Sequence, residues 1–340
     1  MGATTNFTAA ELEHLDEKQT LPRLASVPLA AAGMLIADTT YVADRPWLAA
    51  IMALFTATMM FCWTSALHEA AHQTLWKSRF WSVLWGRLLG AFMFTPYTTY
   101  REAHIRHHAY LNSPRDWELW PYTDPDASLA FRRAFVWFDL LAGVIAGPII
   151  YGRIYFSAKS PIKSPAIRQT IRWEYVGIVA LWSVIWGVVA CLGWWPRHAR
   201  CVLLPMYLAA LMQTGRKFTE HLGMASFDPL LGTRTVLPRK WLLRLSSFLN
   251  FDIFIHGPHH RHPRLVHTQL ESKLDEYRGA NPETTYPAYE RYWKATLAML
   301  PCLWRNPGCG VNAGAAPTDA SLPADAEDFA SDVVAEAGDV

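Results

Sequence analysis

The segment WLAAIMALFTATMMFCWTSALHEAAH, residues 47–72, decides the fold because it joins an apolar run directly to a pair of histidines. Residues 47–67 carry no charged side chain, and about 20 such residues cross a hydrocarbon layer about 30 Å thick as a helix. His68 and His72 follow at once. We therefore predict a transmembrane helix that delivers two histidines to one surface of a membrane.

Three more apolar runs complete the predicted membrane part, at residues 24–42, 175–195 and 202–215. The first is separated from the run at 47–67 by a short turn around Pro46, and the last two are separated by a similarly short polar turn. Short connections make neighbouring helices antiparallel. We predict an all-α integral membrane protein with four transmembrane helices in two hairpins.

Two further apolar segments, residues 80–98 and 134–151, contain charged side chains, Arg87 in the first and Asp139 in the second. A charge within a bilayer is costly. We expect these segments to form helices that lie at the membrane interface or pack against the other helices. The alternative, in which one or both segments span the membrane, stays open.

The basic residues indicate which side of the membrane the polar segments occupy. Of the 31 Lys and Arg residues, 13 lie in residues 68–174 and another 13 in residues 216–305. Loops rich in Lys and Arg stay in the cytoplasm. We therefore expect both segments to form a cytoplasmic helical cap, with both termini on the same side.

The composition excludes several classes of protein. Hydrophobic residues make up 51% and charged residues 18% of the chain, whereas a soluble domain carries about 25% charged residues. A net charge of +2 without long basic runs argues against binding of nucleic acid. The five cysteines include no CxxC pair, which argues against a disulfide framework and a cysteine-based metal site.

Three regions are predicted along the chain. Residues 1–21 contain acidic side chains and no apolar core of a secretory signal, so we expect a cytoplasmic N-terminal segment. Residues 22–305 form the membrane domain. Residues 306–340 are predicted to be a disordered acidic tail, because residues 313–340 are rich in Ala, Asp and Glu and contain no basic residue.

The histidines form three motifs, HEAAH at 68–72, HIRHH at 104–108 and HGPHH at 256–260, and His221 stands alone. Positions i, i+3 and i+4 share one face of a helix, so each motif can aim its imidazoles at a common point. Imidazole binds Zn, Cu, Fe and Ni, and nine imidazoles exceed the needs of one tetrahedral zinc. We predict two metal ions. The candidate ligands are His68, His72, His104, His107, His108, His221, His256, His259 and His260.

Other interpretations of the histidines are weaker. HEAAH alone fits the HExxH motif of zinc proteases, with Glu69 as the base, but the later motifs would then have no role. A metal transporter would place its sites between the membrane spans, whereas these motifs follow the spans or lie in polar segments. The other four histidines are predicted not to bind metal. They are His14, His198, His262 and His267.

The ordered set HEAAH, HIRHH and HGPHH resembles the membrane fatty acid desaturase superfamily, whose pattern is HxxxH, HxxHH and HxxHH around two transmembrane hairpins. The resemblance covers about residues 24–280. It implies a non-haem di-iron centre in which the eight motif histidines bind iron, with His221 as the additional ligand of many members. It also implies molecular oxygen as co-substrate, an apolar chain substrate such as a lipid, and an external electron donor.

The resemblance favours a fatty-acyl desaturase, because HIRHH matches the second motif of desaturases. The alternative is a di-iron hydroxylase, ketolase or decarboxylase acting on an alkane, a fatty acid or a carotenoid. The stretch Glu220-His221-Leu222-Gly223 is similar to the EHxG element of alkane hydroxylases. The chain contains no HPGG haem-binding signature, so we expect a separate donor of the ferredoxin or cytochrome b5 type, docked on the basic cytoplasmic face.

Acidic residues near the motifs are candidates to orient the ligands, since a metal-binding histidine usually donates its second N–H to a carboxylate or carbonyl. Asp116 and Glu220 are the leading candidates. For each acid the alternative is an ordinary surface position or an ion pair with a nearby arginine. The full set is Glu69, Glu102, Asp116, Glu118, Glu220 and Asp252.

Overall fold

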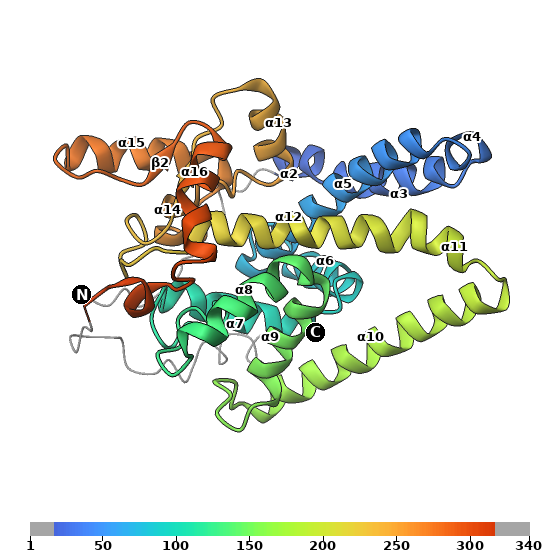
Figure 1. Ribbon diagram of the computed structural model, residues 1–340, viewed down its shortest axis with the longest axis horizontal. Helices are drawn as coiled ribbons and strands as arrows, with labels where there is room; N and C mark the ends of the chain where they lie inside the picture. Colours follow the sequence, from blue (N-terminus) through green and yellow to red (C-terminus); the bar gives the residue numbers. More distant parts are fainter. Residues whose placement is uncertain (1–16, 317–340) are drawn as a thin grey trace.

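The computed structural model describes residues 17–316, and this part of the chain is almost wholly helical (Figure 1). The apolar runs form the long helices. These are α2 (Glu17–Arg23) with α3 (Ser26–Ala37), α5 (Pro46–His72), α10 (Pro165–Cys191), and α12 (Leu204–His221) preceded by α11 (Trp195–His198) and η1 (Ala199–Leu203).

The polar segments form shorter helical elements. Those of the first half of the chain are α4 (Thr40–Ala43), α6 (Arg79–Phe92), α7 (Tyr97–Ala109), α8 (Leu129–Leu141) and α9 (Gly143–Phe156). Those of the second half are α13 (Trp241–Leu249), α14 (His256–Arg261), η2 (His267–Gln269), α15 (Leu270–Ala280), α16 (Tyr292–Met299), η3 (Leu300–Leu303) and η4 (Gly310–Ala313). Strands β1 (Thr235–Val236) and β2 (Ala288–Tyr289) pair in parallel. Figure 1 shows α13 to α16 gathered at one end of the molecule and α11 at the other.

Three helical segments within residues 17–316 are long and apolar enough to cross a membrane: Lys18–Ala37, Pro46–His72 and Pro165–Cys191. They correspond to three of the four predicted spans. The first, Lys18–Ala37, both begins and ends earlier than the predicted 24–42. It ends where it does because the helix stops before Asp38. The Asp38 carboxylate forms an ion pair with Arg197.

The fourth predicted span, residues 202–215, lies inside a continuous helical stretch from Trp195 to His221 that packs along α5 and α9. It is not one of the three segments that are long and apolar enough to cross a membrane. Its last two turns carry Arg216, Lys217 and Glu220, which lower the hydropathy of α12. Three helices are therefore candidate spans by length and composition, and the fourth span stays a prediction.

The two ambiguous segments form helices shorter than the about 20 residues that a span needs. The first is α6, and the second is divided at Ala142 into α8 and α9. Asp139 is not exposed to lipid, because its carboxylate accepts from Lys217 Nζ at 2.6 Å and from Tyr122 Oη at 2.9 Å. At Gly143 a Cβ would lie 2.6 Å from Thr214 Oγ1, so glycine permits the close approach of α9 to α12.

The C-terminal part of the described chain departs from the predicted disordered tail. Residues 306–313 pack against the domain, where Cys309 N donates to Tyr122 O at 2.9 Å and Gly310 N donates to Met224 O at 2.8 Å. Composition places the boundary too early because the acidic bias starts only after these residues. Residues 1–16 and 317–340, which include most of the predicted N-terminal segment and tail, lie outside the described residues.

Candidate metal centre

Four helices bring the nine candidate histidines together. The last turn of α5 carries His68 and His72, α7 carries the second motif, α12 ends at His221, and α14 is the third motif. Eight of the nine side chains are buried and His108 is half-buried. Segments more than 180 residues apart in sequence therefore meet in one interior site.

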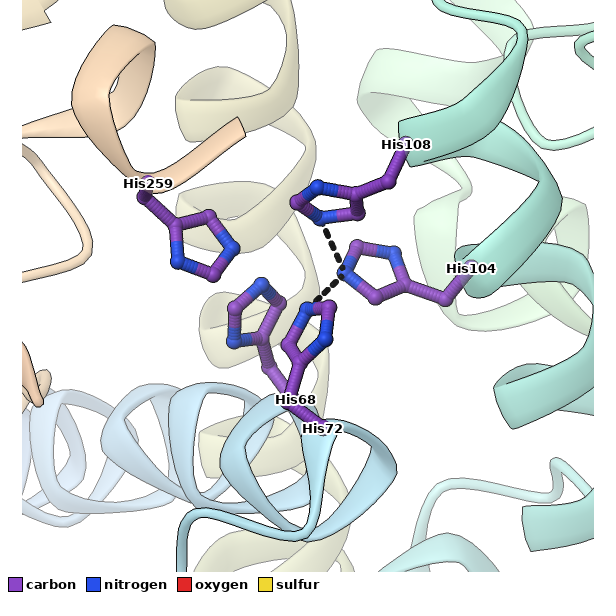
Figure 2. A group of neighbouring side chains, drawn as sticks. All are labelled: His68, His72, His104, His108 and His259. Atoms are coloured by element: carbon purple, nitrogen blue, oxygen red, sulfur yellow. Dashed lines mark hydrogen bonds between the residues drawn. The ribbon is translucent and has the colours of Figure 1, made fainter. Parts of the chain in front are cut away.

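The first histidine group contains five residues that each offer one ring nitrogen, and these five atoms lie within 4.8 Å of one another: His68, His72, His104, His108 and His259. Figure 2 shows their rings directed toward one another from three segments of the chain. His104 Nε2 lies 3.1 Å from His72 Nε2 and 3.1 Å from His108 Nε2.

The other four histidines form two overlapping sets that share His221, namely His107 with His260 and Glu220 with His256, and we treat them together as the second histidine group. His256 Nε2 lies 2.8 Å from His221 Nε2 and 3.0 Å from His260 Nε2. Glu220 lies beside this group, with a carboxylate oxygen within 4.8 Å of the ring nitrogens of His221 and His256. The two groups are adjacent, since the rings of His108 and His260 stack with centroids 4.0 Å apart.

The second and third motifs each divide between the two groups, so the prediction that each motif aims at a single point was wrong for them. In α7, His104 and His108 enter the first group and His107 the second. In α14 the assignment is reversed, and His259 alone enters the first group. The reason is helical geometry: positions i and i+4 nearly superimpose, whereas i+3 points about 60° to the other side.

The spacing of the ring nitrogens fits two metal ions. Bonds of about 2.0–2.1 Å from a metal to nitrogen place neighbouring ligands about 3.0–3.4 Å apart, close to the separations in both groups. Nε2 of His68 and Nε2 of His259 are buried and lack hydrogen-bond partners among residues 17–316. Buried polar atoms normally have a partner, and a metal ion would provide one.

Three carboxylates lie behind the rings and contact Nδ1, which leaves Nε2 free to face the centre of a group. Asp116 Oδ2 lies 2.8 Å from His107 Nδ1, and Glu118 Oε2 lies 2.9 Å from His104 Nδ1. Glu69 Oε1 lies 3.2 Å from His68 Nδ1. Each carboxylate has a second partner: Asn112 N donates to Asp116, Tyr151 Oη to Glu118 and Thr74 Oγ1 to Glu69.

The other three acids have different surroundings. Glu102 pairs with Arg106 at 2.7 Å and Asp252 pairs with Arg23 at 2.9 Å, which is the ion-pair alternative. Glu220 does not lie behind a ring. Its Oε2 is 3.6 Å from His256 Nε2, and its Oε1 is buried without a partner in the described part of the chain. Glu220 thus faces the position that a metal would take.

For several of these histidines the electrostatics favour neutral imidazole, the form that binds metal, whereas burial raises the pKa of Glu220 to about 8 and that of Glu69 to about 7. Burial, together with neighbouring imidazoles, holds the pKa of His259 and His260 well below the ordinary value of 6.5. Burial alone would raise the pKa of Glu118, but the charge and hydrogen bond of His104 lower it to about 2. Glu118 therefore stays ionised at neutral pH.

The histidines predicted not to bind metal lie outside both groups. His262 Nε2 is 2.8 Å from Tyr277 Oη, and His267 packs edge-on against Phe251. His198 lies at the far end of the helical stretch that ends at His221. His14 lies outside the described residues.

The zinc-protease interpretation of HEAAH does not fit this geometry. His68 and His72 share their group with three histidines from other motifs, whereas a zinc protease leaves an open position beside a three-ligand site. Glu69 is held behind the His68 ring by Thr74, so it does not face the centre of the group as a base would.

A largely apolar cavity of about 370 Å³ reaches both histidine groups. Sequence patterns did not identify its walls, which come mainly from the helices α3, α5 to α10 and α12 and meet only in the folded chain. Aromatic side chains form part of the lining: Trp63, Tyr100, Tyr151 and Trp182.

Comparison with known proteins places the chain in a family. Residues 45–293 match the family described as Fatty acid desaturase. The match includes all nine histidines of the two groups. A comparison with curated proteins gives no match. Because the matched residues make up more than half of the chain, the protein belongs to the fatty acid desaturase family.

Proposed function

We propose that the protein is an oxygen-dependent membrane oxidoreductase that introduces a C=C bond into a fatty-acyl chain at a di-iron centre. The two histidine groups carry this proposal, because they offer nine nitrogen ligands around two adjacent points. The first group would hold one iron ion and the second group the other. Family membership and the apolar cavity beside both groups support the same function.

Bound iron would supply the activation of molecular oxygen needed to remove hydrogen from an unactivated C–H bond, which no side chain can do. The residues of the chain have other tasks. The apolar walls bind and orient the substrate chain and exclude water from the histidine groups. Asp116, Glu118 and Glu69 fix the rings of His107, His104 and His68 by contacting Nδ1.

The nature of the product tests the proposed reaction. The purified protein, loaded with iron and supplied with oxygen, a ferredoxin system and an 18-carbon acyl substrate, is expected to yield a product that has lost two hydrogen atoms. Mass spectrometry separates this from the alternative outcomes: a hydroxylase product gains one oxygen atom, and a decarboxylase product loses its carboxyl carbon. Either of these would replace desaturation as the function.

We propose a separate ferredoxin or cytochrome b5-type protein as the electron donor, docking on the basic side of the cap. Arg239, Lys240 and Arg244 are exposed there, at and before α13. Attraction between exposed charges is screened by salt, so turnover with a saturating acyl substrate should fall as ionic strength rises. Turnover that does not depend on salt would argue against this docking mode.

We also propose four spans in two hairpins, with the histidine groups on the cytoplasmic side. The helical stretch Trp195–His221 would be the fourth span. Cys191 provides a test, because it is exposed at the end of α10 opposite the histidines, while Cys62, Cys201 and Cys309 are buried; the half-buried Cys302 is first replaced by Ser. A membrane-impermeant maleimide should label Cys191 from outside the cell. Labelling only after the cytoplasmic side is opened would reverse the topology.

A further inference from the structure

The cavity at the histidine groups extends along one face of the whole helical stretch Trp195–His221. Lining residues recur at helical spacing along this stretch, every three or four residues or a multiple of that. Six of them are His198, Val202, Met206, Gln213, Lys217 and Glu220. The cavity is therefore an elongated space parallel to the helix, with Glu220 at one end and His198 at the other.

The length of this cavity is close to the apolar thickness of a membrane. At about 1.5 Å per residue, His198 and Glu220 are separated by about 33 Å along the helix, and the hydrocarbon core of a bilayer is about 30 Å thick. An acyl chain confined to one leaflet covers about half of that thickness. The cavity is thus long enough for an apolar molecule that reaches from one membrane surface to the other.

His198 is a polar group at the far end of this apolar space. Its side chain is only 8% exposed, and its Nε2 is buried without a hydrogen-bond partner among residues 17–316. The cavity that His198 lines also has apolar side chains in its walls, among them Met34 from α3 and Trp182 and Ile185 from α10. A buried polar atom without a partner destabilises a protein, so this nitrogen is suited to a ligand group that enters the cavity.

Ion pairs tie the helix next to His198 to the end of α3. Asp38 pairs with Arg197, and its second oxygen lies 3.9 Å from Arg200 Nη2. These charged side chains mark the membrane surface opposite the histidine groups, because charges avoid the hydrocarbon core. A ligand whose far end reaches His198 would place that end at a polar boundary.

We propose that His198 forms a distal binding site for the substrate, where its imidazole hydrogen-bonds a polar group, such as a hydroxyl, at the far end of a long apolar molecule. This inference rests on the proposed function only in taking the end at the histidine groups as the reacting end. The substrate class is then a molecule about as long as the bilayer is thick, with a hydrogen-bonding group at its distal end.

Two tritiated probes test this site: a 24-carbon fatty acid and the same acid with a hydroxyl at its last carbon. In a scintillation-based binding assay on the iron-loaded protein in detergent, the hydroxylated acid should bind about tenfold more tightly, since its hydroxyl would form a hydrogen bond with the buried His198 Nε2. His198→Phe should abolish this preference, and His198→Gln, which can still hydrogen-bond, should retain part of it. His262→Phe, the same substitution outside the cavity, should leave it unchanged.

Equal binding of the two probes by the wild type, no binding of either, or a preference that survives in His198→Phe would overturn the distal site. Iron content is measured on the same preparation, and product formation is measured on it after oxygen and a ferredoxin system have been added. If the protein holds no iron or oxidises neither probe but still prefers the hydroxylated acid, the proposed function fails and the distal site stands. If it is iron-loaded and active without the preference, only the distal site fails.

Discussion

Nδ1 of His107 lies 2.8 Å from Oδ2 of Asp116, and both side chains are buried. The same carboxylate oxygen accepts from Asn112 N at 3.1 Å, and Oδ1 accepts from Leu119 N at 3.3 Å. The backbone of the loop after α7 thus fixes Asp116, and Asp116 fixes the His107 ring. An ionised Asp116 keeps the ring proton on Nδ1, so that Nε2 is available to a metal ion.

Asp116→Asn should weaken metal binding in the second histidine group about ten- to 100-fold, because an amide no longer selects the correct ring tautomer of His107. Titration of metal-free protein with Fe²⁺ under anaerobic conditions measures this affinity. Asp275→Asn, at an exposed position in α15, serves as the control and should bind iron like the wild type. Equal affinity in all three proteins would show that Asp116 does not orient the ligand.

Gly147 of α9 lines the cavity, and a Cβ at this position would meet no atom within 4 Å. Gly147→Leu should therefore fill space that the substrate needs. Binding of a tritiated 18-carbon fatty acid should fall about tenfold, because the cavity cannot hold both the leucine side chain and the methylenes of the acyl chain without overpacking. Gly187→Leu in α10 is the matched control. Its Cβ is equally free, but Gly187 does not line the cavity. Similar losses in both variants would contradict this role of the cavity.

Gly310 holds the C-terminal segment against the loop that carries Asp116. Its φ is +56°, and a Cβ there would lie 1.9 Å from Asn112 O. Gly310→Ala should lower the free energy of unfolding by at least about 2 kcal/mol through backbone strain and steric overlap. Gly279→Ala in α15, where a Cβ meets no atom within 4 Å, should instead stabilise by about 0.5–1 kcal/mol. Chemical denaturation in detergent micelles measures both, and an unchanged Gly310→Ala protein would refute the packing of this segment.

His267 predicts a dependence of stability on pH that does not involve the metal. Burial, with a smaller effect from Arg23, lowers the pKa of His267 to about 3. Since an unfolded histidine titrates near pH 6.5, only the unfolded state takes up this proton between pH 6.5 and 3. Stability is therefore complete above pH 6.5 and falls by about 1.4 kcal/mol per pH unit below it.

His267→Phe removes this contribution. Between pH 6.5 and 5 the wild type should lose about 2 kcal/mol more free energy of unfolding than the variant, by the same relation. Denaturation curves of both proteins at the two pH values provide the comparison. The contributions of the other histidines to the pH dependence are the same in both proteins and cancel. Equal losses in the two proteins would show that His267 is protonated in the folded state.

The spacing of the histidine motifs and their position after apolar runs were enough to predict an all-helical chain with nine histidines in one place. Their division into two groups was not predictable, because it depends on how α7 and α14 face each other. His107 and His259 cross to the opposite group from their motif partners. Glu118 ranked low among the acids, since nothing in the sequence shows that the loop after α7 folds back onto His104.

Helices long and apolar enough to cross a membrane could be predicted where apolar length alone decides, as for α5 and α10. The fourth run was different, because α12 combines apolar residues with Arg216 and Lys217. Arg216 donates to Ser65 Oγ at 2.7 Å and Lys217 pairs with Asp139. Such contacts place charges inside a helical bundle, and only the tertiary structure reveals them.

The number of metal ions tests the central claim most directly. Iron is measured by inductively coupled plasma mass spectrometry in the purified wild type, in His72→Ala of the first histidine group and in His260→Ala of the second. We predict two iron ions per chain in the wild type and about one in each variant, because each substitution removes a ligand from one group only. One zinc ion per chain in the wild type, or iron content that neither substitution changes, would contradict the account.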